Sequence, residues 1–268
     1  MEQPASVRAR RRVIRLAAAL LITTFGYRSN RTFAAEVVSA PDRLHAVDPA
    51  TLAYTYGVGS FTPEFTPPPP GSYTLPVVDT LDDHPVLTSD GRATTLFALK
   101  PNRLAVVGFI YTTCTEAAGC PFSNAVMQRI DRTLAADPDL ARQVSLITIS
   151  FDPERDTPTR MGTVRGFYQP ESNWDFVTTR GDAELEPLLA DFNQPVSKLR
   201  FADGQWSGLF RHVLKVFLLD RDNKVRNVYS VGFLNPQLVL NDLQTVLMEG
   251  PSANGKPPTP SNDVPSQK

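Results

Sequence analysis

Residues 104–134, LAVVGFIYTTCTEAAGCPFSNAVMQRIDRTL, decide the fold. They begin with an apolar run, over 104–110, whose length and composition are typical of a strand buried on both faces of a sheet. Pro121 stands where the first residue of a helix is expected, because its fixed φ suits that position. Apolar side chains then recur every four residues, at Phe122, Val126, Ile130 and Leu134. The stretch therefore predicts a buried strand, a loop and an amphipathic helix.

On the carboxyl-terminal side, helices and strands alternate. We expect a buried strand over 144–151, helices over 157–168 and 182–192, strands over 213–219 and 224–231, and a last helix over 236–248. Two strand–helix–strand crossovers followed by a hairpin imply a mixed sheet, and this is the order of elements in thioredoxin. With short strands near 74–97, the prediction is an α/β, thioredoxin-like fold with a mixed central sheet, helices on both faces and an N-terminal β-hairpin extension.

The two ends of the chain differ in composition from this central part. Arginines crowd residues 8–15, an apolar run follows over 16–25, and small residues end the segment, a pattern typical of a secretory signal. We therefore expect export to the periplasm or the extracytoplasmic face of the membrane. The predicted parts are a signal peptide or short N-terminal anchor (1–35), a proline-rich spacer (36–72), a thioredoxin-like domain (73–250) and a disordered tail (251–268).

The charge of the chain argues against one class of partner. There are 27 Lys and Arg against 28 Asp and Glu, and seven of the basic residues but one of the acidic residues lie in the first 35 positions. Without that segment the net charge is −7, which disfavours nucleic acid and anionic membranes. A basic partner or a cation is favoured instead.

Cys114 and Cys120 are the only cysteines in the chain. A disulfide that closes so short a loop stabilises a fold less than one that closes a long loop, so we expect the pair to carry chemistry. Cys120 directly precedes Pro121 and thus lies at a helix N-terminus, where the helix dipole and unpaired N–H groups favour a thiolate. Cys120 is therefore expected to have the lower pKa of the two.

His212 is the third candidate for the site. It stands directly before the expected strand over 213–219, which in the thioredoxin order lies beside the cysteine loop. Two thiolates and one imidazole form a soft, low-coordinate ligand set that suits Cu(I). In the polar turn 152–158, Asp156 is expected to cap the helix that follows, while Asp152 and Glu154 are candidates for the rim of the site.

Three motifs together resemble the Sco/SenC family: Thr113-Cys114 with Cys120-Pro121, the stretch SFDPERDTP over 150–158, and His212 before Leu218-Leu219-Asp220. The resemblance extends over roughly 75–249. Members of that family are thioredoxin-like, membrane-tethered copper proteins that help assemble the copper centre of cytochrome oxidase. The resemblance implies that Cys114, Cys120 and His212 bind copper, as Cu(I) and also as Cu(II). It further implies two partners: the copper-bearing subunit of the oxidase or its apoprotein, and a thioredoxin-like protein that reduces the cysteines.

Two functions stay open at this point. His212 favours a copper chaperone without turnover of its own. Arg211, whose charge disfavours a neighbouring cation, and the five residues between the cysteines, where the family has three, favour a thiol–disulfide oxidoreductase. Cys114 and Cys120 would then be the redox pair that reduces the cysteines of a copper-site apoprotein. A binding module that keeps a disulfide as a staple is the third alternative.

Overall fold

The computed structural model describes residues 65–116 and 119–250, so the predicted signal segment, the tail and most of the spacer lie outside the described residues. The central stretch forms the predicted elements. β4 (Leu104–Ile110) is buried along its whole length, and α1 (Cys120–Ala135) begins at the second cysteine with Pro121 in its first turn. The four predicted apolar positions of α1 are all buried.

β4 lies inside an eight-stranded sheet with the order β1-β10-β9-β4-β5-β6-β2-β3. The other strands are β1 (Asp79–Thr80), β2 (Pro85–Thr88), β3 (Ala93–Thr95), β5 (Val144–Ser150), β6 (Trp174–Thr178), β9 (Lys215–Leu219) and β10 (Lys224–Ser230). β4, β5 and β6 run parallel, whereas β9 is antiparallel to both β4 and β10. β2 and β3 form a hairpin that pairs with the outer edge of β6. The mixed sheet with an N-terminal hairpin is thereby confirmed.

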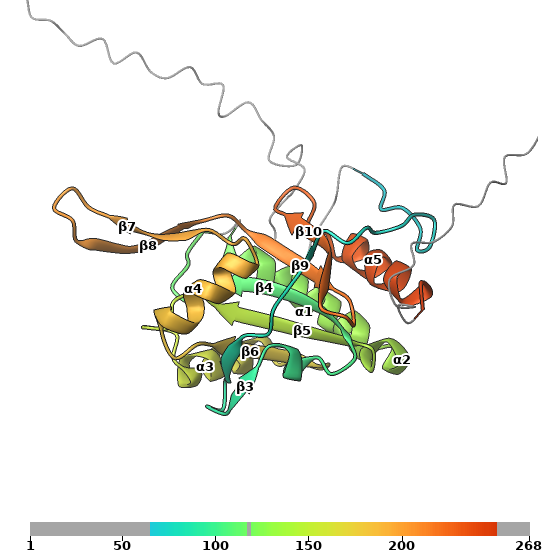
Figure 1. Cartoon of the computed structure of the whole chain (residues 1–268), viewed down its shortest axis with the longest axis horizontal. Helices are drawn as coiled ribbons and strands as arrows, with labels where there is room; N and C mark the ends of the chain where they lie inside the picture. Colours follow the sequence, from blue (N-terminus) through green and yellow to red (C-terminus); the bar gives the residue numbers. More distant parts are fainter. Residues whose placement is uncertain (1–64, 117–118, 251–268) are drawn as a thin grey trace, which may run out of the picture. The chain divides into compact units, whose positions relative to one another are not determined.

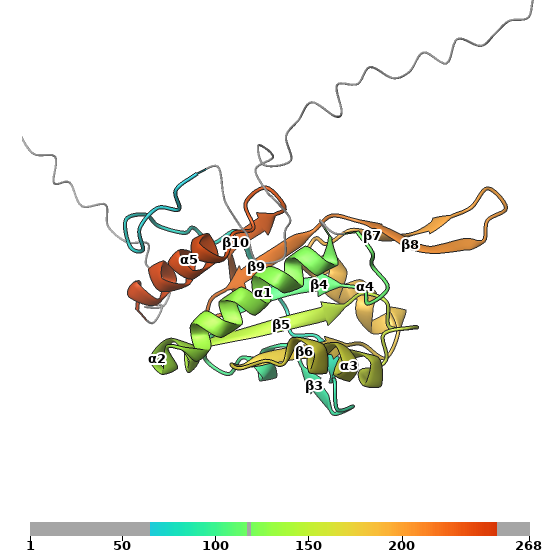
Figure 2. The ribbon, with the colours of Figure 1, turned by 180° about the vertical axis from the view of Figure 1, so that it is seen from behind.

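Helices cover the sheet on both sides. Besides α1 they are α2 (Pro138–Ala141), α3 (Pro158–Tyr168), α4 (Asp182–Asp191) and α5 (Pro236–Met248). α4 lies over the face of the sheet seen in Figure 1, and α1 lies over the opposite face, seen in Figure 2. Across the described ranges, no helix combines the length and the apolar character that crossing a membrane requires. This arrangement confirms the predicted thioredoxin-like architecture.

Side-chain caps decide where two of the helices begin. Asn235 caps α5, as its position before Pro236 suggests, by accepting hydrogen bonds from two backbone N–H groups. Thr157 caps α3 by accepting a hydrogen bond from the Arg160 N–H group. The prediction that Asp156 caps this helix is wrong. Its carboxylate is fully buried and accepts hydrogen bonds from residues of other elements, described below.

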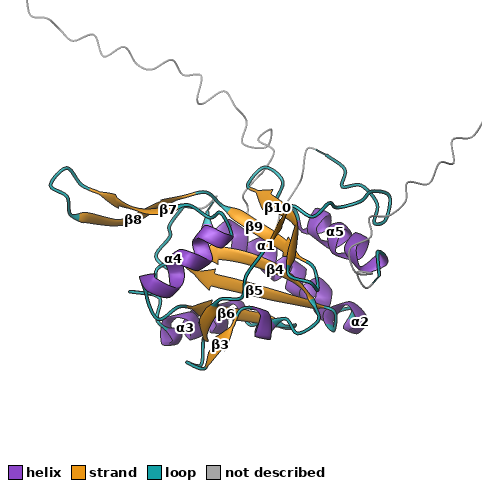
Figure 3. Ribbon diagram, in the orientation of Figure 1, coloured by secondary structure: helices purple, strands orange, loops and turns teal. Residues whose placement is uncertain are grey.

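The sequence pattern does not predict a second, two-stranded sheet formed by β7 (Val196–Arg200) and β8 (Trp206–His212). This hairpin extends away from the eight-stranded sheet (Figures 1 and 3). A bulge between Lys198 and Arg200 shifts its register and hides the usual strand alternation. His212 consequently ends β8, and β9 begins only at Lys215. The prediction that His212 opens the strand over 213–219 is corrected in this respect.

The segment before β1 lies along α5. The Asn241 side chain donates a hydrogen bond to the Pro68 carbonyl at 2.8 Å, and the Gly71 N–H group donates to the Thr245 hydroxyl at 3.0 Å. Both Pro68 and Gly71 belong to the predicted spacer. Its last residues are therefore attached to the domain.

Candidate metal and thiol site

The loop between β4 and α1 carries both cysteines. Cys114 is half-buried and Cys120 is 4% exposed, and both are free thiols. A Cβ on Gly119 would lie 3.3 Å from the Cys114 sulfur and 3.2 Å from the Glu116 carbonyl oxygen. Glycine thus permits the close approach that brings the Cys114 sulfur to the start of α1. Residues 117–118 of this loop lie outside the described residues.

The two thiols have very different acidities. The Cys120 thiol donates a hydrogen bond to the Cys114 sulfur, and with help from the backbone N–H groups of Cys120 and Glu116 this lowers the pKa of Cys114 to about 5. The same hydrogen bond, together with burial, raises the pKa of Cys120 far above its usual value. The prediction that Cys120 has the lower pKa is therefore wrong. The N-terminus of α1 does stabilise a thiolate, but it is the thiolate of Cys114.

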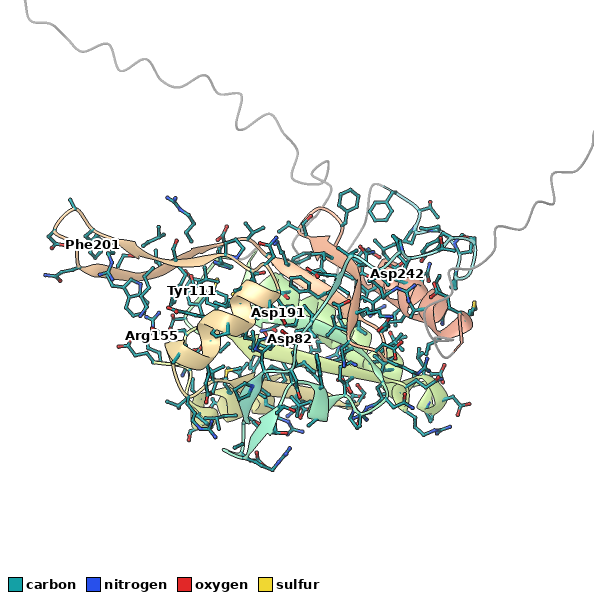
Figure 4. All side chains as sticks on the ribbon, viewed as in Figure 1. Asp82, Tyr111, Arg155, Asp191, Phe201 and Asp242 are labelled. Carbon is teal, nitrogen blue, oxygen red and sulfur yellow. The ribbon has the colours of Figure 1, made fainter. Side chains whose placement is uncertain are left out.

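Tyr111, labelled in Figure 4, connects the cysteine loop to His212. Burial and a hydrogen bond to Cys114 raise the pKa of Tyr111 to about 12, so its hydroxyl remains a donor. Its ring lies edge-on to the His212 imidazole with a centroid separation of 5.6 Å, and the Phe151 ring lies 5.0 Å from the same imidazole. The Nδ1 atom of His212 is buried and has no hydrogen-bond partner among the described residues. Burying an unpaired nitrogen costs free energy, which a ligand would recover.

Asp156 fixes the backbone that leads into the cysteine loop. Its carboxylate accepts hydrogen bonds from the Thr112 N–H group at 2.9 Å, from the Thr112 hydroxyl and from the Ser150 hydroxyl at 2.6 Å. Thr112 lies two residues before Cys114, and Ser150 is the last residue of β5. The buried carboxylate therefore ties the start of the loop to the neighbouring strand.

Arg155, also labelled in Figure 4, holds the β7–β8 hairpin. Its guanidinium pairs with Asp152 at 2.5 Å, donates to the Gly208 carbonyl at 3.0 Å and lies over the Trp206 ring, 4.0 Å from the centroid. Asp152 is 1% exposed, so it lies inside the turn and not on the rim that was predicted for it. Because Gly208 and Trp206 belong to the strand that ends at His212, Arg155 helps to position that histidine.

A pocket of about 210 Å³ opens beside the cysteines. Its walls come from the cysteine loop, α1 and α3 and include Cys114, Cys120, Asn124, Arg160, Phe167 and Tyr168. Within 65–116 and 119–250, the buried Asn124 Oδ1 atom has no hydrogen-bond partner. The pocket gives solvent access to the half-buried Cys114, whereas Cys120 is 4% exposed.

The three predicted ligands are not grouped as a finished metal site. Within residues 65–116 and 119–250, no three His, Cys, Asp or Glu side chains are close enough together to hold one metal ion. The sulfur and imidazole donors are nevertheless of the types that bind a soft cation. Cys114 favours the thiolate form, and His212 has a ring nitrogen without a partner among the described residues. The structure brings Cys114 and Cys120 together and places Tyr111 in contact with both Cys114 and His212.

Sequence reasoning missed Tyr111 and Arg155 as parts of this site. Tyr111 directly follows the buried strand β4 and precedes Cys114 by three residues, so its position beside the cysteine loop was available as a signal. Arg155 lies in a polar turn that holds more charged residues than one helix cap needs. That excess was the signal for contacts beyond the turn itself.

Comparison with known proteins adds the context of a family. The SCO1/SenC family model matches residues 82–248. A Stutzerimonas stutzeri protein named for copper binding is 27% identical over 146 residues, and the match spans 54% of this chain and 64% of the length of that relative.

Two solved structures share the fold. ScoI of Bradyrhizobium japonicum, solved with copper bound, is 23% identical with a TM-score of 0.51, and the match covers 62% of this chain and 98% of that one. BsSco, a member of the Sco family of cytochrome c oxidase assembly proteins in which a disulfide switch was identified, is 24% identical with a TM-score of 0.51, covering 65% and 96%.

Proposed function

Because the chain belongs to the SCO1/SenC family, we propose that it is a copper chaperone that binds Cu(I) through Cys114, Cys120 and His212. One observation carries the proposal: Tyr111 contacts both the Cys114 sulfur and the His212 ring, while the buried Nδ1 atom of His212 lacks a partner in the described part of the chain. Two thiols and an imidazole are donors that suit Cu(I), and copper as cargo would supply the missing partner.

The acceptor in this proposal is the copper-bearing subunit of cytochrome oxidase or its apoprotein. The relatives support it, because one is named for copper binding, one holds copper and one belongs to a family of cytochrome c oxidase assembly proteins. The basic and apolar N-terminal segment supports an extracytoplasmic location. Disulfides persist in such compartments, so a thioredoxin-like reductant is the second proposed partner.

Titration of Cu(I) against a competing chelator tests the copper site, using anaerobically reduced protein. Wild type should bind one Cu(I) per chain, and His212→Ala should weaken the affinity by about tenfold or more, since both thiolates remain. Cys114→Ser and Cys120→Ser should weaken it much further. Oxidised wild type is the control and should bind no Cu(I). Equal affinity for reduced wild type and Cys114→Ser would overturn the copper site.

Thiol–disulfide exchange is the second candidate function, and the unequal acidity of the two thiols favours it. With a pKa of about 5, Cys114 is a thiolate at neutral pH, whereas Cys120 keeps its proton. Cys114 would attack a disulfide of the apoprotein, forming a mixed disulfide and releasing one thiolate. Cys120, on losing its proton, would then attack the Cys114 sulfur and release the second thiolate. Two electrons pass to the apoprotein, and this protein is left with a Cys114–Cys120 disulfide.

Trapping the mixed disulfide distinguishes this function from copper binding. Cys120→Ser cannot complete the second attack, so its adduct with an oxidised apoprotein should accumulate on Cys114 and be seen by mass spectrometry. Cys114→Ser is the matched control and should form no adduct. Adducts of equal yield in both variants would contradict the assignment of Cys114 as the attacking thiol.

A further inference from the structure

The β7–β8 hairpin has one face that packs on the site and one face that does not. Phe210 and His212, two residues apart at the end of β8, contact Tyr111 and Phe151, and Trp206 at the start of β8 contacts Arg155. Leu209 and Arg211 lie between them in the sequence, and both are exposed. Because successive residues of a strand point to opposite faces, these two belong to the outer face. The hairpin therefore presents a free surface directly beside the thiol site.

The hairpin and its flanks expose large apolar side chains. Phe201 is 60% exposed, Leu209 is 46% exposed and Val213, just after the hairpin, is 52% exposed. They make up three of the eight large apolar side chains with the greatest exposure in the described ranges. Phe201 lies at the far end of the hairpin, whereas Tyr111 lies near its base and Arg155 lies between them, against Trp206 (Figure 4). Exposed apolar side chains spaced along a projecting element offer several contact points for a partner.

The charge of the hairpin is opposite to that of the rest of the domain. Residues 196–212 contain Lys198, Arg200 and Arg211 against Asp203, a net charge of +2. The other described residues carry 14 basic and 21 acidic side chains, a net charge of −7. An acidic partner is therefore attracted to the hairpin and repelled by the remaining surface, which would orient it toward the thiol site.

We propose that the β7–β8 hairpin is a docking arm for an acidic protein surface that carries an apolar patch. On the proposed function, this partner is the copper acceptor, and the arm holds it beside Cys114 and His212. Phe201 is the apolar anchor, and Arg200 supplies the charge that attracts the partner. A protein is favoured over a membrane because the acidic remainder of the domain repels anionic lipid, and because the chemistry at the base of the arm acts on another protein.

Direct binding of the apo form of the soluble copper-bearing oxidase domain tests the arm without any copper. The full-length, reduced protein is used, and the equilibrium and association rates are measured at low and high salt. Phe201→Ser should weaken binding by about tenfold or more, as expected for an exposed aromatic anchor. Arg200→Glu should slow association and flatten its dependence on salt.

Two variants elsewhere on the surface serve as matched controls. Phe233 is also 60% exposed, and Arg129 is exposed on α1. Phe233→Ser and Arg129→Glu should bind the oxidase domain within about twofold of wild type. All four variants should keep the Cu(I) affinity of wild type, since none of these residues belongs to the copper site.

The outcomes separate the arm from the copper site. Wild-type binding by Phe201→Ser and Arg200→Glu, or no binding of the oxidase domain by wild type, would overturn the docking arm and leave the Cu(I) titration unaffected. Loss of Cu(I) binding in wild type with the oxidase domain still bound through Phe201 would overturn the copper site alone. Binding of phosphatidylglycerol vesicles that depends on Phe201, without binding of the oxidase domain, would assign the arm to a membrane and overturn the proposal.

Discussion

At Cys114, the hydrogen bond from the Cys120 thiol contributes most to the lowered pKa of about 5, and the N–H groups of Cys120 and Glu116 and the Tyr111 hydroxyl assist it. Burial of Cys114 opposes these donors but does not outweigh them. The position of Cys120 at the start of α1 was predictable. Which of the two cysteines becomes the thiolate was not predictable, because this depends on which sulfur is more buried and which one faces the free N–H groups.

Alkylation with iodoacetamide, resolved by residue with mass spectrometry, should modify Cys114 with a midpoint near pH 5 in the reduced wild type. The thiolate is the reactive form, so a lowered pKa moves the midpoint to lower pH. Cys120 should stay unmodified through neutral pH, because its own pKa is raised. In Cys120→Ala the largest cause of the shift is absent, so the midpoint of Cys114 should rise.

Protein unfolded in urea is the control for this measurement. Both thiols should then titrate near their ordinary value of 9.0. If Cys120 in the folded protein is modified at a lower pH than Cys114, the assignment of Cys114 as the thiolate and Cys120 as the protonated thiol is wrong. The thiol-exchange mechanism would then have to begin at Cys120.

Among the elements, the turn 152–158 shows why a local interpretation of a polar motif falls short. Thr157 caps α3 within the turn, but Asp156 bonds to Thr112 and Arg155 bonds to Gly208, which are 44 and 53 residues away in sequence. The sequence predicted a helix start here and placed it correctly. It did not reveal that the same turn also holds the cysteine loop and the hairpin, because both contacts arise only when distant segments fold together.

Arg155→Met should destabilise the protein by about 2 kcal/mol at neutral pH, because it leaves the buried Asp152 carboxylate without its countercharge. Burial already raises the pKa of Asp152 while Arg155 lowers it in part, so this pKa should rise further in the variant. Once protonated, Asp152 needs no countercharge. The loss of stability should therefore shrink as the pH falls through that raised pKa, and urea unfolding at several pH values measures it.

The control for this variant is Arg129→Met, on the exposed side of α1, which should change stability by no more than about 0.5 kcal/mol. Adding Asp152→Asn to Arg155→Met should recover part of the loss at neutral pH, because the unpaired charge is gone. A loss that is the same at every pH, or no recovery in the double variant, would show that packing of Arg155 on Trp206 matters more than its charge.

For the molecule as a whole, the buried elements were predictable and the half-exposed ones were not. β4 and β5 lie in the middle of the sheet and are buried along their whole length, β4 as a continuous apolar run and β5 as a run rich in β-branched residues. β7 and β8 are only partly buried, carry a bulge and place Gly208 at a φ of +85°, so their sequence resembles a loop. The chemistry of the site residues could be named from the sequence. Their grouping could not, because His212 is positioned by this hairpin.

The segment before β1, which contains Tyr73, is attached to the rest of the domain at Asp242 of α5, labelled in Figure 4. This carboxylate is 1% exposed and accepts hydrogen bonds from the Tyr229 hydroxyl at 2.6 Å, the Asn227 side-chain amide at 2.8 Å and the Tyr73 hydroxyl. Burial and the hydrogen bond to Asp242 raise the pKa of Tyr73 to about 12. The stabilisation from this tyrosine is therefore complete below its ordinary pKa of 10.0 and is lost as the pH rises toward about 12.

Asp242→Asn should lower the free energy of unfolding by about 2 kcal/mol, since the amide keeps only one acceptor oxygen for three donors and the charge that strengthens these bonds is absent. Urea unfolding at pH 8 measures the loss. Asp139→Asn, at a carboxylate whose side chain is 84% exposed in a surface ion pair, is the control and should cost less than about 1 kcal/mol. Equal losses in the two variants would mean that the hydrogen bonds to Asp242 do not attach the segment before β1 to the domain.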